Sequence, residues 1–156
     1  MILILTADGG SRGNPGPSAY GFAIWKSDLK DLNKEILMQI VVKTEPDFKV
    51  GKYIGHATNN QVEWGGLIAG LEYIKENVTD IEKIYIALDS ELVVKQITGI
   101  YKVKNPGLQP LFLQAKQVLD SFKKTAIPFE FLHIYREFNK IADAQVNQAL
   151  DNLNQI

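Results

Sequence analysis

The chain has 156 residues, no cysteine, and a formal net charge of −1 from 17 Lys+Arg and 18 Asp+Glu. The length suits one domain spanning residues 1–156. Disulfides and thiolate metal sites are excluded, and the balanced charge argues against a protein that binds nucleic acid through overall charge alone.

The N-terminus, MILILTAD, has no basic residue before its apolar run, which ends at Leu5. This pattern does not match a signal peptide, and no window reaches the roughly 20 apolar residues needed to cross a bilayer. We therefore expect a cytoplasmic protein that does not bind membranes.

The first third of the chain predicts three strands in an antiparallel meander. Residues 2–6 are apolar on both faces, and residues 20–26 follow a Gly/Pro-rich stretch as the second strand. A charged turn at 28–34 precedes the third expected strand, 35–43. Residues 46–55 are expected to be an irregular connection.

The rest of the chain alternates between helical and strand patterns. Further strands are expected at 83–88 and 127–134. The expected helices are 60–77, 91–97, 108–123 and 139–152. Three strands followed by alternating helices and strands predict an α/β domain with a mixed five-stranded sheet flanked by helices.

Four acidic residues stand at positions where each has an ordinary structural explanation. Asp8 would be a turn residue, Asp89 a helix N-cap, and Asp143 a solvated flank of the last helix. Glu63 would form a capping box with Asn60. Taken together they suggest a site, because Asp8 and Asp89 would end neighbouring strands if the fourth strand pairs beside the first, and ligands bind outside such strand ends.

Four carboxylates gathered in one place would repel each other unless cations neutralised them. Their oxygen ligands favour Mg²⁺ or Mn²⁺, and zinc is not expected in a chain with no cysteine and two histidines. Two such ions about 3.5–4 Å apart are the usual device for phosphodiester hydrolysis.

Four motifs occur in order along nearly the whole chain. They are DGGSRGNPG at 8–16, TNNQVE at 58–63, DSELV at 89–93 and NKIAD at 139–143. Together they resemble the motifs of the type 1 ribonuclease H family. The resemblance implies a ribonuclease H-like fold and an endonuclease that cuts the RNA strand of RNA–DNA hybrids, leaving 5′-phosphate and 3′-hydroxyl ends.

The resemblance also implies a role for each acid. Asp8 would bridge two Mg²⁺ ions, and Asp143 would help hold the ion that activates the attacking water. Glu63 and Asp89 would hold the ion that stabilises the leaving oxygen. Mn²⁺ could replace Mg²⁺, the partner would be an RNA–DNA hybrid, and the protein is expected to be a monomer.

Substrate contacts are implied in the same way. Backbone near Ser11 and Asn14, with Asn60, would sense RNA 2′-hydroxyls in the minor groove, and Thr58 would approach a DNA phosphate. His56 stands where relatives often have Arg, and would bind better when protonated. The residues expected to contact substrate are Gly9, Ser11, Asn14, His56, Thr58, Asn60 and Arg136.

The chain departs from the common family pattern in two segments. The loop at 134–139 is short and lacks the mobile histidine of many members, so it resembles a short-loop branch in which Arg136 could neutralise a phosphate. The segment 96–110 is too short for the basic protrusion that grips the hybrid, and leaves a small strip of Lys95, Lys102 and Lys104. We therefore expect weaker and strongly salt-sensitive hybrid binding.

Several alternatives stay open. The chain could be another two-metal nuclease of the same fold or a non-catalytic hybrid-binding module, and activity on double-stranded RNA is not decided by the motifs. Trp25 and Trp64 are interpreted as packing residues rather than base-stacking platforms, because they lie in a strand and in an amphipathic helix.

Overall fold

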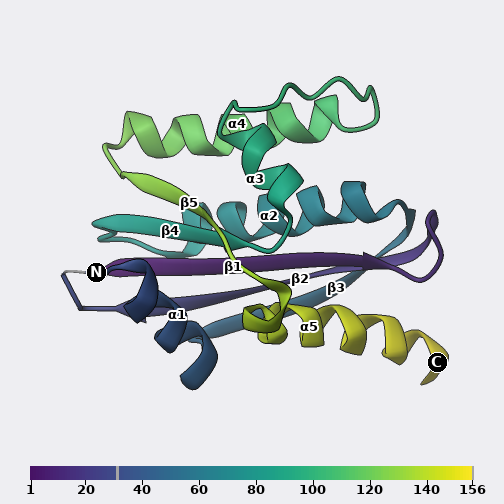
Figure 1. Cartoon of the computed structure of the whole chain (residues 1–156), viewed down its shortest axis with the longest axis horizontal. Helices are drawn as coiled ribbons and strands as arrows, with labels where there is room; N and C mark the ends of the chain where they lie inside the picture. Colours follow the sequence, from purple (N-terminus) through teal and green to yellow (C-terminus); the bar gives the residue numbers. More distant parts are fainter. Residues whose placement is uncertain (31, 156) are drawn as a thin grey trace.

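The computed structural model describes residues 1–30 and 32–155, and its centre is a five-stranded sheet in the order β3-β2-β1-β4-β5 (Figure 1). The strands are β1 (Ile2–Ser11), β2 (Gly16–Ser27), β3 (Phe48–Ala57), β4 (Lys83–Leu88) and β5 (Phe129–His133). The pairs β1–β2 and β2–β3 are antiparallel, while β1–β4 and β4–β5 are parallel. The predicted mixed five-stranded sheet is confirmed.

Helices cover both faces of this sheet. The helices are α1 (Lys34–Lys43), α2 (Asn59–Asn77), α3 (Glu91–Ile97), α4 (Gln109–Lys124) and α5 (Lys140–Asp151), with short 3₁₀ turns η1 (Arg136–Phe138) and η2 (Asn152–Gln155). Figure 1 shows α2, α3 and α4 on one side of the sheet and α1 and α5 on the other. Within the described ranges, no helix is long and apolar enough to cross a membrane.

The hydrophobic core follows the alternation of side chains along the strands. On β1, Leu3 and Leu5 belong to the cluster that contains Leu67 of α2, whereas Ile4 packs in a second cluster with Leu37 of α1. Trp25 and Trp64 are 2% and 0% exposed, which confirms them as packing residues.

The prediction of a strand at 35–43 is wrong, because this segment is helix α1. Asn33 caps it by accepting a hydrogen bond from the Ile36 N–H (2.8 Å), and Leu37 and Val41, one helical turn apart, are the residues it buries. The third strand is β3, which lies mostly within the segment expected to be irregular. The predicted turn at 28–34 includes residue 31, which lies outside the described residues.

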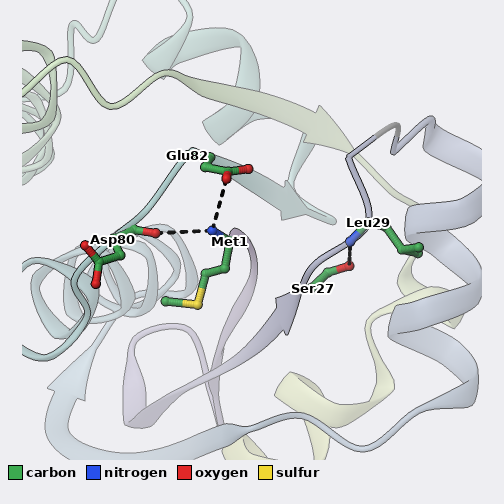
Figure 2. A network of polar contacts seen from close by, with 5 residues as sticks. All are labelled: Met1, Ser27, Leu29, Asp80 and Glu82. Carbon is green, nitrogen blue, oxygen red and sulfur yellow. Dashed lines mark hydrogen bonds and ion pairs between the residues drawn. The ribbon is translucent and has the colours of Figure 1, made fainter.

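The start of β1 is fixed against the segment that leads into β4. The Met1 carbonyl accepts a hydrogen bond from the Glu82 N–H (2.8 Å). The Met1 amino group donates to the Asp80 carbonyl (3.2 Å) and lies 3.6 Å from Glu82 Oε1 (Figure 2). Figure 2 also shows the hydrogen bond from the Leu29 N–H to Ser27 Oγ (3.2 Å) at the end of β2. The contacts of Met1 hold β1 and β4 in one register, which decides where the residues after them lie.

Candidate metal and nucleic-acid site

Three carboxylates from three elements meet at one end of the parallel strands. Ala7 pairs with Leu88 across β1 and β4, so Asp8 and Asp89 continue neighbouring strands at the same level. One carboxylate oxygen from each of Asp8, Glu63 and Asp89 lies within 4.8 Å of the other two. The expected neighbourhood of the first and fourth strands is therefore confirmed, and it brings three of the four predicted acids together.

Glu63 is free to face Asp8 because it does not take part in a helix cap. Thr58 is the N-cap of α2: its Oγ1 accepts from the Gln61 N–H (3.2 Å), and Gln61 Oε1 accepts from the Thr58 N–H (3.1 Å). The ordinary explanation of Glu63 as part of a capping box with Asn60 therefore does not hold.

The backbone of β1 lies directly on the start of α2 at Gly9. A Cβ atom at this position would stand 2.5 Å from the Glu63 nitrogen and 2.6 Å from the Val62 oxygen, closer than any side chain allows. Gly9, predicted as a substrate contact, thus has a packing role that lets Asp8 and Glu63 approach each other.

The ordinary explanation of Asp89 as a helix N-cap does not hold either. Ser90 caps α3 by accepting a hydrogen bond from the Val93 N–H (3.2 Å). Asp89 Oδ2 is buried and has no hydrogen-bond partner among the described residues. A buried acceptor without a partner is costly, which is expected of a group that binds an ion.

The crowding of these acids shifts their protonation. Burial, followed by the charge of Asp89, raises the pKa of Asp8 to about 8. Burial raises the pKa of Glu63 to about 7, opposed by a hydrogen bond with Ser90, and burial raises the pKa of Asp89 as well. An all-oxygen ligand set that carries uncompensated negative charge fits a hard divalent cation.

Asp143 borders this cluster without joining it. It lies in the first turn of α5, partly exposed, and accepts a weak hydrogen bond from Asn147 Nδ2 (3.4 Å). Its charge contributes to the raised pKa values of Asp8 and Asp89.

Asn139 connects the last helix to the first strand, and the sequence alone did not single it out as a site residue. It is 1% exposed, and its Nδ2 donates to the Ala7 carbonyl (2.9 Å). Its own carbonyl accepts from the Asp143 N–H (3.2 Å), and its N–H donates to the Arg136 carbonyl (2.9 Å). The side chain and backbone of this one residue thereby fix Arg136 and Asp143 relative to β1, and the NKIAD motif was the signal for it.

The glycine-rich stretch after Asp8 completes β1 and forms a short hairpin loop at 12–15, and it is tied to the start of α2. The Ser11 N–H donates to Asn59 Oδ1 (2.9 Å), and the Asn59 N–H donates to Asn14 Oδ1 (3.1 Å). Ser11 Oγ also donates to the Ala57 carbonyl (2.8 Å). Asn59 is thus a second residue that sequence reasoning missed, and it fixes the loop beside the residues predicted to contact substrate.

A polar cleft of about 330 Å³ opens beside this loop. Its lining residues are Asn14, Thr58, Asn60, Gln61, Asn105, Gly107 and Leu108. Three of them were predicted as substrate contacts, whereas Asn105 and Gly107 were not. His56 lies at the end of β3, exposed, and does not line the cleft.

The basic side chains Arg136 and Lys95 differ in their contacts with acidic side chains. Arg136 is exposed, and its positive charge acts on Glu63 and Asp89. This charge lowers the pKa of both carboxyl groups and so opposes the increase that burial causes. In the predicted basic strip, Lys95 pairs with Glu91 (2.6 Å), and its ammonium lies 5.1 Å from the centre of the Tyr101 ring.

A family model described as "Reverse transcriptase-like" matches residues 47–149. The chain is 38% identical over 146 residues to "Ribonuclease HI" of Halobacterium salinarum, covering 93% of this chain and 62% of that protein. It is also 38% identical over 152 residues to a protein of Mycobacterium tuberculosis described as bifunctional, covering 97% of this chain and 36% of that one. The chain thus spans about a third to two thirds of these curated relatives.

Solved structures show the same likeness. The RNase H1 of Halobacterium salinarum aligns with a TM-score of 0.79 at 33% identity, covering 97% of this chain and 99% of that one. LC11-RNase H1, solved in complex with an RNA/DNA hybrid, aligns with a TM-score of 0.77 at 32% identity, covering 97% and 98%.

Proposed function

Because the chain belongs to the type 1 ribonuclease H family, we propose that it is an endonuclease that hydrolyses the RNA strand of RNA–DNA hybrids, leaving 5′-phosphate and 3′-hydroxyl ends. The observation that carries this proposal is the convergence of Asp8, Glu63 and Asp89 within 4.8 Å, with Asp143 at their border. A hybrid-binding module would have no use for four acids that repel the phosphates it binds.

Asp8, Glu63, Asp89 and Asp143 would hold divalent cations, and we infer two Mg²⁺ ions, with Mn²⁺ as a substitute. When bound, such ions supply Lewis-acid stabilisation of the phosphodiester and make water a better nucleophile. The partly buried carboxylates would contribute the negative charge that binds the ions, and Asp89 Oδ2 is the buried acceptor that has no partner among the described residues.

The remaining residues would position the hybrid. Asn14 and Asn60 line the cleft with amide groups that can both donate to and accept from an RNA 2′-hydroxyl. Ser11 acts indirectly, because its N–H is already committed to Asn59. Arg136 stands exposed beside Glu63 and Asp89, where a guanidinium would neutralise a phosphate.

The test is cleavage of a labelled RNA–DNA duplex by the parent protein and by Asp8→Asn. The variant keeps an acceptor for the Gly9 N–H, which donates to Asp8 Oδ1 (2.9 Å), so its fold should be retained. We expect internal cuts by the parent, and a variant that binds the duplex without cutting it. A variant that cuts as well as the parent would remove Asp8 from the mechanism.

A matched set of duplexes separates the alternatives. Hybrid, double-stranded RNA, DNA and a single-ribonucleotide junction are incubated with Mg²⁺ or Mn²⁺. Internal cutting confined to the hybrid supports the proposal. Trimming from the ends indicates an exonuclease, and equal cutting of double-stranded RNA indicates a broader ribonuclease.

A further inference from the structure

The start of α1 and the chain after β5 enclose a recess that contains a lysine without an ion-pair partner. Its volume is about 160 Å³, and its lining residues are Lys34, Met38, His133, Ile134, Tyr135 and Phe138. Lys34 is exposed and forms no ion pair with any described residue. Within the part of the chain that the structure describes, no acidic side chain lines the recess. The recess is therefore positively charged, although four acids stand nearby.

Apolar packing fixes the two walls of this recess relative to each other. Ile134 is buried in the cluster that contains Leu37 of α1. Met38, the next residue of α1, packs against the same cluster, and so does Phe138. Because both walls share one cluster, the backbone of Lys34 at the start of α1 is held beside the residues that follow β5.

The wall formed after β5 is joined to the strand that leads into the acidic cluster. His133 pairs with Leu88 across β5 and β4. The Ile134 N–H then donates to the Leu88 carbonyl (2.9 Å), and Leu88 directly precedes Asp89. The recess thus lies beside the residue that carries one of the clustered acids.

A duplex bound at these acids would present phosphates to the recess, because its phosphates lie on the outside while its bases stay paired within. Each strand of a duplex carries one phosphate per about 3.4 Å of helix axis. A phosphate within a few nucleotides of the scissile one can therefore meet the recess while every base keeps its partner. Lysine is a compact cation that suits phosphate, and the ring N–H of His133 and the hydroxyl of Tyr135 are hydrogen-bond donors.

We propose that this recess binds one non-scissile phosphate of the RNA strand, within a few nucleotides of the cut, through Lys34 with His133 and Tyr135 as hydrogen-bond donors. A recess of about 160 Å³ has room for a single phosphate group. Lys34 comes from the segment between β2 and β3, outside residues 47–149 that match the family model. This inference rests on the proposed function, because it is the acidic cluster that brings the RNA strand to the recess.

The first experiment removes the charge of one phosphate at a time. Hybrids with one cleavage position carry an uncharged methylphosphonate at successive positions of the RNA strand, with a 2′-deoxynucleotide on its 5′ side that keeps the linkage stable. Matched hybrids carry the same deoxynucleotide with an ordinary phosphate. The ratio kcat/KM is measured for the parent, Lys34→Gln and Lys34→Arg, which should all fold because Lys34 is exposed.

The parent should respond to one particular phosphate outside the cleavage position. Neutralising it should reduce kcat/KM by roughly five-fold, the size of an ion pair near a protein surface. Lys34→Gln should show this loss already with the ordinary hybrid, and no further loss when the same phosphate is neutralised. Lys34→Arg keeps the charge and should respond as the parent does.

The second experiment measures the charge by binding alone. In an Asp8→Asn background, which should bind without cutting, the affinity for the hybrid is measured between about 50 and 200 mM salt. Lys34→Gln should reduce the slope of log K against log salt by about one. Lys124→Gln is the matched control: it removes an exposed lysine at the end of α4, on the opposite side of the sheet, and should leave the slope unchanged.

The outcomes separate this proposal from the function itself. A parent protein that cuts no hybrid contradicts the function, while an unchanged salt slope in Lys34→Gln overturns the phosphate site. A parent that cuts, together with a Lys34→Gln variant that responds to every neutralised phosphate as the parent does, overturns the site while the function stands. A loss found only when phosphates of the DNA strand are neutralised, in a parallel series, overturns the assignment to the RNA strand.

Discussion

At the scale of single residues, the site is costly when no cation is present. Asp8, with a pKa of about 8 against an ordinary value of 3.8, is charged at high pH only at the expense of its burial and of the negative charge of Asp89. One pKa unit corresponds to about 1.4 kcal/mol. Charged acids therefore lower the free energy of unfolding, and a bound cation would offset this cost.

The first prediction concerns the pH dependence of stability in a metal chelator. Below pH 3.8 both folded and unfolded chains keep the Asp8 proton, and above about pH 8 both have lost it, so the stability that Asp8 contributes is lost as pH rises between these values. Thermal melts of the parent and Asp8→Asn from pH 4 to pH 9 should diverge, the variant being several °C more stable at the upper end. Parallel melting curves would contradict the raised pKa.

The second prediction concerns ion binding without any assay of activity. At pH 8, Mg²⁺ at a hundred times its dissociation constant should stabilise the parent by about 2.7 kcal/mol. Glu63→Gln should lose most of this effect, because it removes one of the three clustered carboxylates. Asp120→Asn, which removes an exposed acid of α4, is the control and should keep the full shift. Equal shifts in all three proteins would contradict the site.

At the scale of elements, the position of α5 depends on contact with the sheet at a glycine. A Cβ atom at Gly21 of β2 would stand 2.4 Å from the Ala142 carbonyl, so α5 lies directly on the strand there. Asp143 follows Ala142 immediately, and the placement of its carboxylate is therefore set by the backbone of β2.

The third prediction tests this contact. Gly21→Ala should push α5 away from the sheet, lower the free energy of unfolding by about 1–3 kcal/mol, and reduce kcat more than it changes KM. Gly65→Ala is the control, since its Cβ would meet only Tyr20 at 3.7 Å and a helix interior favours Ala by about 0.5–1 kcal/mol. A Gly21→Ala protein with unchanged kcat would show that Asp143 is positioned by other contacts.

The elements also show what the sequence could and could not predict. Asp8 and Asp89 were found because each follows an apolar run, a local signal, although β1 itself continues past Asp8 to Ser11. Residues 35–43 were misassigned because a short apolar run has no unambiguous period, and the cap at Asn33 decided for the helix. Strand β3 was missed because it is mostly exposed and is held by pairing with β2, a partner that the local pattern does not reveal. Asn105 joins the cleft only through the tertiary fold.

At the scale of the whole molecule, a net charge of −1 must be reconciled with the proposed binding of a polyanion. The short basic strip of Lys95 in α3 and of Lys102 and Lys104 in the following loop has unequal members. Lys95 is held by Glu91 and the Tyr101 ring, whereas Lys102 and Lys104 are exposed. Hybrid binding should therefore depend on few lysines and fall steeply with salt.

The fourth prediction compares these lysines directly. In an Asp8→Asn background, Lys102→Gln or Lys104→Gln should each reduce the slope of log affinity against log salt by about one. Lys95→Gln should reduce it less, because its charge is already compensated by Glu91. Anisotropy titrations with a labelled hybrid measure the slopes, and a Lys95→Gln effect as large as the others would refute this ranking.

The hydrogen bond from Asn139 Nδ2 to the Ala7 carbonyl joins positions 132 residues apart. During synthesis Asp8 is therefore made long before Asn139, the residue that ties α5 beside it. The acids of β1 and α5 cannot be fixed relative to each other by this contact until residue 139 has been made.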